Sequence, residues 1–222
     1  MSEWWSYRLS NFLMFSPQVY HRLFETHNRS WWPLQLLALA FGAAVLLTML
    51  RGGAIAARVA TAAMGAAWIF IGWAFFMQRF ADIHIGGTWM AAAFALQGLL
   101  LLGTAALSPW RFARDAVARS GVVMFAFALL FWPLLAFIEE RPWQQAEVFG
   151  LVPDPTAIAT LGLVLAGQRI AWWLVPIPLL WCVFSGATLW SLGEMHAFLA
   201  PALALAALAL MLISLQYRNR KS

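Results

Sequence analysis

The chain has 222 residues, of which 63% are hydrophobic and only 10% are charged. Soluble domains carry about 25% charged residues, so this composition and a mean hydropathy of +0.75 exclude a water-soluble globular domain. The net charge of +5 does not indicate nucleic acid binding, because the basic residues are spread over short loops and a tail rather than along one helix face. The composition predicts an integral membrane protein that has the lipid bilayer as its partner and no nucleic acid partner.

The first 32 residues are too polar to cross a membrane. Ser16 can cap a helix and Pro17 suits the first helical position, so we expect a helix from residue 17. Its apolar side is expected to hold Val19, Leu23 and Phe24, and its polar side His21, Arg22, Glu25 and Arg29. This pattern predicts an amphipathic helix lying on the membrane surface. Four tryptophans would lie at headgroup level: Trp4, Trp5, Trp31 and Trp32.

Six later segments are apolar enough to cross a bilayer, for which about 20 apolar residues are needed. None of the six contains Asp, Glu, Lys, Arg or His. They are Pro33–Leu50, Val59–Phe76, Thr88–Leu107, Gly121–Ile138, Ala171–Leu192 and Ala197–Leu215.

A seventh apolar stretch, Thr156–Ala166, is shorter than the others. Asp154 can cap a helix that begins at Pro155, and Gly167 can end it. Such a helix is about 21 Å long, whereas the hydrocarbon core is about 30 Å thick. The stretch therefore either crosses the membrane as a short helix with buried ends or re-enters on one side.

These alternatives give two topologies. With seven crossings the termini lie on opposite sides, and nine basic residues share the side of the C-terminus: Arg51, Arg58, Arg111, Arg114, Arg119, Arg169, Arg218, Arg220 and Lys221. The other side then holds Arg8, Arg22, Arg29, Arg79 and Arg141. A re-entrant stretch reverses this balance, but it also requires the arginine-rich loop "RFARDAVAR" to be translocated. Asp115 would be the single acidic residue on the C-terminal side, which supports seven crossings.

We therefore predict an all-α polytopic transmembrane helix bundle of six full spans and one short, crossing or re-entrant, helix, preceded by an interfacial amphipathic helix. Residues 1–32 form the interfacial segment, 33–216 the bundle and 217–222 a basic tail. The basic residues favour an outside N-terminus and a cytoplasmic C-terminus in a bacterial inner membrane.

Three stretches of the chain match the pattern of a known family. In "FSPQVYHRLFETHNRSWWP" the matching positions are Phe15, Ser16, Pro17, Asn28, Trp32 and Pro33. In "FGLVPDPTAIATLGLVLA" they are Phe149, Gly150, Pro155, Thr156, Thr160, Leu161 and Gly162. "VPIPLLWCVFSGATLWSLG" resembles the span that follows in the family. With these three stretches the chain resembles the DUF6064 family of bacterial multi-span membrane proteins. The resemblance implies a multi-span membrane fold and brings no activity.

This chain departs from the family pattern at three places. Asp154 stands where the family has Cys before Pro-Thr, and Gly72-Trp73 stands where it has a Tyr-His pair. A Gly-His step after the fourth span appears here as part of "AFIEERPW". No role of those family residues is carried over to these positions.

All four histidines fall on the predicted outer side, with two carboxylate-x-His pairs among them. Histidine and carboxylate side chains are ligands of zinc, iron and copper. The seven-span topology places both pairs at the face that also holds Glu139-Glu140, so an outer metal site is one hypothesis; its ligands would be Asp82, His84, Glu194 and His196. The alternative is that polar residues gather there because they cannot enter lipid.

Polar residues within the bundle offer a second hypothesis. Their side chains either join helix to helix or line a narrow path for a small neutral solute. The candidates centre on the short segment and are Asp154, Thr156, Thr160, Gln97 and Ser185.

For function we favour a non-catalytic subunit or scaffold that packs with membrane partners, lipid or pigment, or with a second copy of the chain. The basis is the uncharged spans, the many tryptophans and the small residues that allow close helix packing. A passive channel and a metal-binding protein are the alternatives. The sequence leaves any cofactor unknown and shows no catalytic constellation. The single cysteine, Cys182, is expected to be a buried apolar residue.

Overall fold

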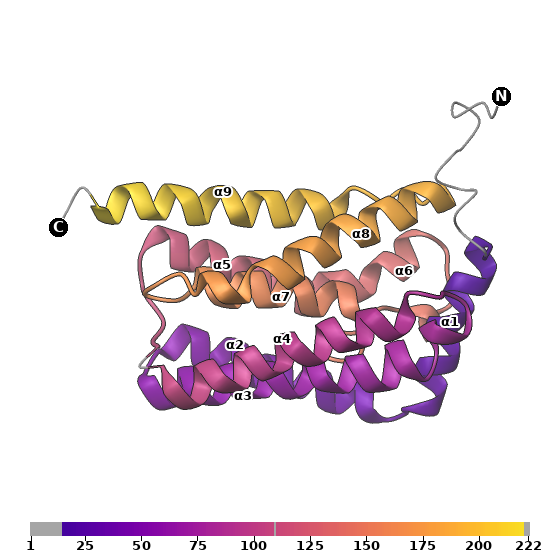
Figure 1. Cartoon of the computed structure of the whole chain (residues 1–222), viewed down its shortest axis with the longest axis horizontal. Coiled ribbons are helices and arrows are strands. Elements are labelled where there is room, and N and C mark those ends of the chain that lie inside the picture. The colour runs from indigo at the N-terminus through magenta and orange to yellow at the C-terminus, as the bar shows by residue number, and fades with distance from the viewer. Residues whose placement is uncertain (1–14, 109, 220–222) are drawn as a thin grey trace.

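A computed structural model describes residues 15–108 and 110–219, which form an all-helical bundle (Figure 1). Five helical segments are long and apolar enough to cross a membrane: Leu34–Arg51, Ala54–Asp82, Gly87–Leu107, Ala116–Ile138 and Trp172–Leu192. A further helix is apolar over Leu199–Leu215. This confirms the predicted fold class. Trp4, Trp5 and the tail residues 220–222 lie outside the described residues.

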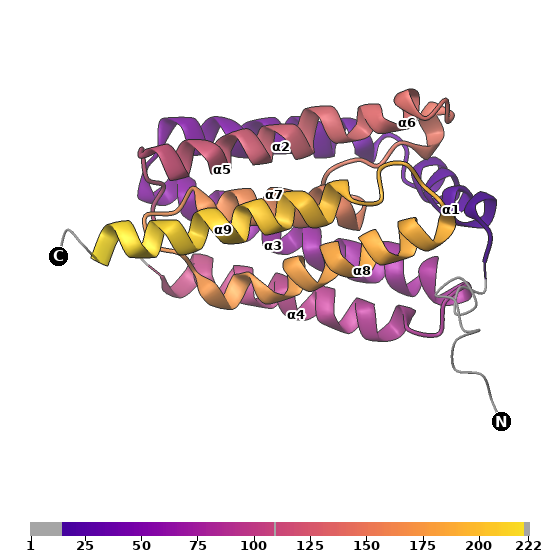
Figure 2. The same cartoon turned by 90° about the horizontal axis from the view of Figure 1, so that it is seen from above.

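The helices run back and forth between the two ends of the bundle (Figures 1 and 2). In chain order the main helices are α1 (Pro17–Ser30), α2 (Leu34–Arg51), α3 (Ala54–Ile71), α4 (Gly87–Leu107), α5 (Ala116–Ala126), α6 (Leu135–Ile138), α7 (Pro153–Leu165), α8 (Pro176–Leu192) and α9 (Leu199–Asn219). The end of α9 lies opposite the end that carries α1. We call these the α9 end and the α1 end.

Two of the predicted spans are not regular α-helices. α3 continues as a π-helical turn over Gly72–Met77. Between α5 and α6 the helix widens to π over Phe127–Phe131 and then tightens to a 3-10 turn over Trp132–Leu134. Pro133 explains the second irregularity, because its nitrogen has no proton to donate to the carbonyl of the preceding turn.

The short segment lies at the centre of the bundle. Every residue from Ala146 to Gly167 is buried, and α7 contacts α3, α5, α8 and α9. The irregular stretch 146–152 enters from the α1 end, and the Phe149 ring lies 2.9 Å from where a Cβ on Gly42 would be, midway along α2. At the α9 end, Gly167 pairs with Phe112 in an antiparallel bridge.

The irregular stretch adds to the length that α7 covers along the bundle. Gly42 is eight residues beyond the start of α2, so the stretch reaches about 12 Å into the bundle. The 13 residues of α7 add about 20 Å. Together they extend about as far as a hydrocarbon core is thick, about 30 Å.

The predicted start of α7 was wrong by two residues. Val152 is the capping position, Pro153 is the first helical residue and Asp154 lies within the first turn. Thr156 supplies the side-chain contact there, because its Oγ1 accepts from the N–H of Gly150 at 2.9 Å. Pro153 suits the first helical position because a proline has no N–H that needs a partner there. The same reason had led to the expectation of Pro155 at this position. The helix ends before Gly167, as predicted.

α1 packs across the end of the bundle, and Ser16 caps it as predicted. Its expected faces were partly wrong, because His21 is buried whereas Val19 is 41% exposed. Asn28 explains the orientation: its Nδ2 donates to the carbonyls of Gln144 and Ala146, at 2.7 and 2.8 Å. α1 is thus tied to the loop that leads into α7.

Small residues let α5 and α7 approach closely. A Cβ added at Gly162 would lie 2.6 Å from the carbonyl oxygen of Gly121 and 2.9 Å from the backbone nitrogen of Phe125. Backbone atoms cannot move aside as a flexible side chain can, so the contact requires glycine.

Gly162→Ala is therefore expected to lower the stability of the fold by about 1–3 kcal/mol through overpacking. The measurement is the thermal unfolding midpoint of the full chain in a mild detergent. Gly103→Ala is the matched control, because a Cβ at Gly103 in α4 would meet no atom within 4 Å. Equal midpoints for the two variants would show that the close approach of α5 and α7 is not as described.

Candidate metal centre

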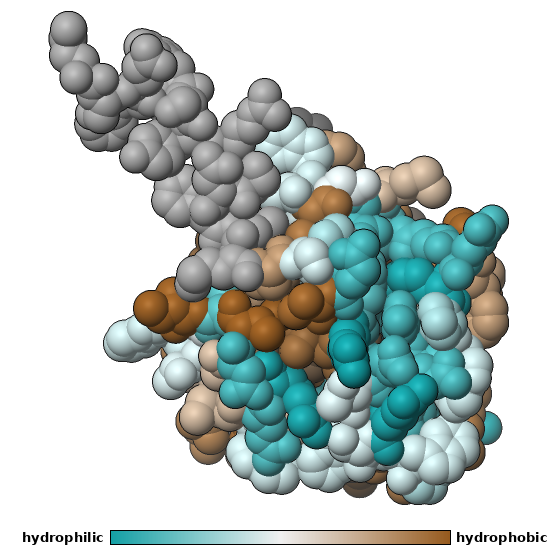
Figure 3. Space-filling view, turned by 90° about the vertical axis from the view of Figure 1, so that its right-hand side faces the viewer, coloured by the Kyte–Doolittle hydropathy of each residue, from teal (hydrophilic) through white to brown (hydrophobic). Residues whose placement is uncertain are grey.

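Polar side chains gather at the α1 end of the bundle. Figure 3 looks onto this end, where hydrophilic residues cover a large part of the visible face beside a smaller hydrophobic patch next to the grey atoms. Three segments meet beneath this surface: α1, the loop that follows α6 and the loop between α8 and α9. We call the five side chains that connect them the outer cluster: His21, Glu139, Arg141, Glu194 and His196.

Arg141 is the centre of this cluster. Its Nη2 and Nε lie 2.7 and 2.9 Å from Oε2 of Glu139, and its Nη1 lies 3.1 Å from Nδ1 of His21. His21 in turn contacts Glu194 through Nε2 at 2.7 Å. The side chains of Arg141 and Glu139 are only 9% and 10% exposed, so this ion pair is largely removed from water.

The contacts of His21 define its tautomer. A guanidinium group can only donate, so Nδ1 of His21 must accept from Arg141 and carries no proton. Nε2 then carries the proton and donates to Oε1 of Glu194. Burial is the main cause that lowers the pKa of His21, and the nearby Arg141 lowers it further, which agrees with a neutral ring.

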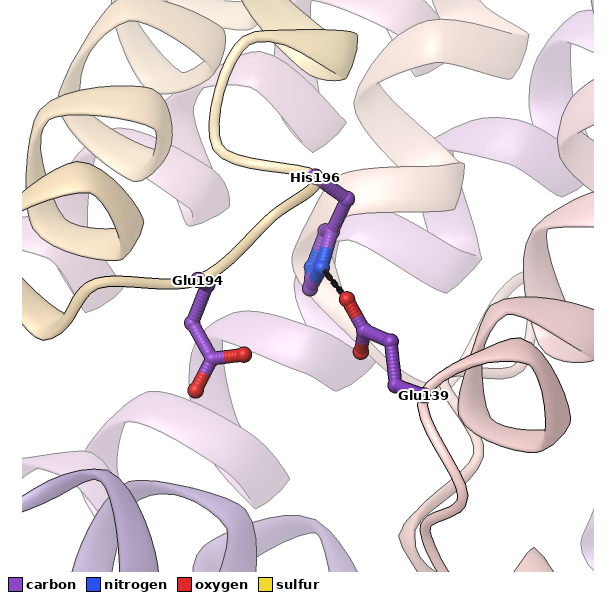
Figure 4. Close-up of side chains that lie close together, drawn as sticks. All are labelled: Glu139, Glu194 and His196. Atoms are coloured by element: carbon purple, nitrogen blue, oxygen red, sulfur yellow. Dashed lines mark hydrogen bonds and ion pairs between the residues drawn. The ribbon is translucent and has the colours of Figure 1, made fainter.

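Glu139, Glu194 and His196 converge in a way that suits a metal ion. Each offers one ligand atom, and these atoms lie within 4.8 Å of one another. Figure 4 shows the three side chains pointing toward a common space, with Nδ1 of His196 hydrogen-bonded to Oε1 of Glu139. The other ring nitrogen of His196 is buried and has no hydrogen-bond partner among residues 15–108 and 110–219.

Neighbouring side chains orient both carboxylates. Glu139 directs Oε2 to Arg141 and Glu194 directs Oε1 to His21. Oε1 of Glu139 faces His196, and Oε2 of Glu194 has no hydrogen bond to another described residue. Metal sites commonly have such an outer layer of hydrogen bonds, which fixes the direction of each ligand.

A second layer of carboxyl groups lies deeper in the bundle. Trp132 donates to Oε2 of Glu147 at 3.1 Å. Oε1 of Glu147 lies 3.9 Å from Nη2 of Arg141. Asp154 is also buried and accepts from Trp181 Nε1 and Ser185 Oγ, both at 2.6 Å.

The structure brings together one of the two predicted carboxylate-x-His pairs. Glu194 and His196 share the group with Glu139, whereas neither Asp82 nor His84 contributes an atom to it. His84 packs against the rings of Phe80 and Phe184, and its Nδ1 accepts from the N–H of Gly86. Partial burial lowers the pKa of His84.

The residues of the conduit hypothesis each have hydrogen bonds within the bundle. Gln97 donates to the carbonyl of Leu174, and Thr160 donates to the carbonyl of Thr156 and accepts from Trp68. Asp154 and Ser185 bond to one another. All five predicted residues are buried, at 3% exposure or less.

Sequence reasoning missed His21, Arg141 and Glu147 as members of this site. The charge of Arg141 and its place two residues after Glu139 were visible, but this spacing matches no metal or catalytic motif. His21 was expected on the polar side of α1. The helical pattern alone does not decide its position, because a histidine between apolar residues can lie on either face of a helix.

A family model described as "Family of unknown function (DUF6064)" matches residues 17–222. The chain belongs to the DUF6064 family. The matched range includes every residue of the outer cluster and the whole of α7. No match was found among curated proteins or among solved structures.

Asp154, where this DUF6064 member departs from the family pattern, is held by hydrogen bonds within the bundle. The carboxylate stands where the family pattern led us to expect a thiol, and it accepts two hydrogen bonds from α8. A carboxylate buried without such donors would be strongly unfavourable. Trp181 and Ser185 therefore stabilise the carboxylate at this position and join α7 to α8.

Arg141→Met is expected to destabilise the fold by about 3–5 kcal/mol, because it leaves buried carboxylates without their compensating charge. The thermal unfolding midpoint in detergent measures this effect. Arg29→Met is the matched control: it also breaks an arginine–glutamate pair, but its side chain is 67% exposed, so a loss below about 1 kcal/mol is expected. Similar losses for both would contradict the burial of the Arg141 network.

Acidification is expected to weaken the α1 end through His27. Burial lowers the pKa of His27 from 6.5 to about 4 in the folded chain. The folded state therefore favours the neutral ring, and the resulting stability is fully present above pH 6.5 and lost as the pH falls toward 4. Its size is on the order of 3 kcal/mol at most.

His27→Leu tests this dependence, since the side chain packs against the rings of Trp31, Phe70 and Phe75 and an apolar replacement suits them. Unfolding midpoints at several pH values between 4 and 7.5 should fall less steeply on acidification in the variant than in the unaltered chain. His21 contributes in the same direction and remains in both proteins. Parallel curves would contradict the assignment to His27.

Proposed function

We propose that this protein is a non-catalytic, multi-pass subunit of the bacterial inner membrane that binds a divalent metal ion at its outer end. The observation that carries the proposal is the convergence of Glu139, Glu194 and His196 from two separate loops. The ion would join the loop after α6 to the loop before α9, beneath α1.

The donor set favours a first-row metal such as Zn²⁺ or Fe²⁺, because imidazole suits zinc and iron and carboxylates suit harder ions. Glu139, Glu194 and His196 would be three ligands. His21, whose Nε2 donates to Glu194, would orient this carboxylate toward the ion.

Burial supports binding rather than catalysis. The side chains of the outer cluster are between 7% and 16% exposed. An ion in this place is enclosed by α1 and by the two loops, which suits a structural role in a membrane subunit better than turnover of a substrate.

The charge distribution supports the proposed orientation. The described loops and helix ends at the α9 end carry Arg51, Arg58, Arg111, Arg114, Arg119 and Arg169. Arginine-rich loops stay on the cytoplasmic side. The combined length of the irregular stretch and α7 supports a seventh crossing. With that crossing, the outer cluster would lie outside the cytoplasm.

Metal analysis of the full chain, purified in mild detergent, tests the proposal. The protein is first stripped with a chelator and then reloaded with Zn²⁺ or Fe²⁺ in separate samples. We expect about one ion bound per chain for at least one metal, and at least a tenfold weaker affinity for His196→Gln and for Glu194→Gln.

Glu140→Gln is the matched control, because Glu140 is exposed and adjacent to Glu139 in sequence. It removes the same charge from the same loop and should retain the ion. The proposal is overturned if the unaltered chain binds neither metal stoichiometrically, or if the control loses the ion as the two cluster variants do.

A further inference from the structure

A pocket of about 320 Å³ lies at the α9 end, where the ends of α4, α7 and α8 meet. Its lining includes Trp110, Arg111, Arg169 and Trp173. It is therefore far from the outer cluster, and it combines two guanidinium groups with two indole rings.

The two arginines of this pocket carry charge that the described residues do not compensate. Arg111 and Arg169 are exposed, and neither guanidinium has an ion pair or hydrogen bond to another described residue. Their backbone carbonyls are occupied instead, by the N–H of Gln168 and by Nε1 of Trp110. The side chains remain available for an anion.

The pocket lies beside apolar surface. Leu107, at the end of α4, is 88% exposed, and Trp173 is 54% exposed with its Nε1 bonded to Thr104. Tryptophan is enriched at the level of lipid headgroups. An anion bound here would therefore have apolar surface beside it that could accommodate acyl chains.

We propose that Arg111 and Arg169 bind the phosphate group of an anionic phospholipid in this pocket. Guanidinium groups pair well with phosphate oxygens, and basic pockets between helices on the cytoplasmic side bind acidic headgroups. This inference goes beyond the proposed metal binding and does not depend on it.

A bound lipid would stabilise the contact between the end of α7 and the loop that carries Arg111. The loop that carries Arg111 pairs with the end of α7 through Phe112 and Gly167. The same loop reaches α2, because Nη2 of Arg114 donates to the carbonyl of Arg51 at 3.0 Å. A headgroup held between Arg111 and Arg169 would add a further link between this loop and the segment that follows α7.

The test measures lipid affinity of the full chain in detergent, with phosphatidylglycerol, phosphatidylcholine and inorganic phosphate as separate additions. Retained lipid is counted by native mass spectrometry, and the thermal midpoint is recorded in parallel. We expect phosphatidylglycerol to bind at least tenfold more tightly than phosphatidylcholine. We also expect inorganic phosphate at the same concentration to leave the midpoint unchanged.

The double variant Arg111→Gln/Arg169→Gln should lose this preference. Arg58→Gln/Arg119→Gln is the matched control, since it removes two charges from the same end but outside the pocket, and it should keep the preference. Arg111→Lys/Arg169→Lys preserves the charge and should retain most of the binding, which separates loss of phosphate contacts from damage to the fold.

Three results would overturn the proposal. They are equal affinity for the two lipids, equal loss of preference in the pocket and control variants, and stabilisation by inorganic phosphate that matches that by phosphatidylglycerol. The last result would identify a free anion rather than a lipid as the occupant. Metal binding at the outer cluster is measured separately, so failure of one proposal is distinguishable from failure of the other.

Discussion

The central constraint on this protein is that an irregular stretch of backbone lies inside an apolar bundle. Unpaired N–H and C=O groups are costly where water is absent. Here the groups are satisfied locally: Gly150 donates to Thr156, whose hydroxyl donates to the carbonyl of Val152. Asn28 of α1 satisfies the carbonyl of Ala146 at the start of the stretch. The position of α1, and so the outer cluster, depends on these bonds.

The outer cluster follows from the same arrangement. Because Asn28 fixes α1 over the loop after α6, His21 faces Arg141 rather than water. Arg141 then holds Glu139, and His21 holds Glu194, each through one carboxylate oxygen. The irregular stretch 146–152 thus determines which side chains meet at the α1 end of the bundle. The two ends differ in chemistry, with paired carboxylates and histidines at the α1 end and exposed arginines at the α9 end.

The sequence predicted what depends on local patterns and missed what depends on tertiary contacts. Hydropathy identified the spans, and Ser16 with Pro17 identified the start of α1 because a cap is read within a few residues. Asp154 looked like a cap for the same reason, yet its carboxylate bonds to Trp181 and Ser185, which lie 27 and 31 residues away. Glu194 and His196 were found through their spacing, whereas Arg141 and His21 join them only because α1 folds back over the bundle.

X-ray absorption spectroscopy at the metal edge of the reloaded chain tests the central claim most directly, because it reports the atoms bound to the ion. The account predicts a mixed shell in which at least one imidazole nitrogen, at about 2.0–2.1 Å for zinc, accompanies carboxylate oxygens. The imidazole signature should disappear in His196→Gln. A shell of water oxygens alone, or a sulfur ligand from Cys182, would contradict it.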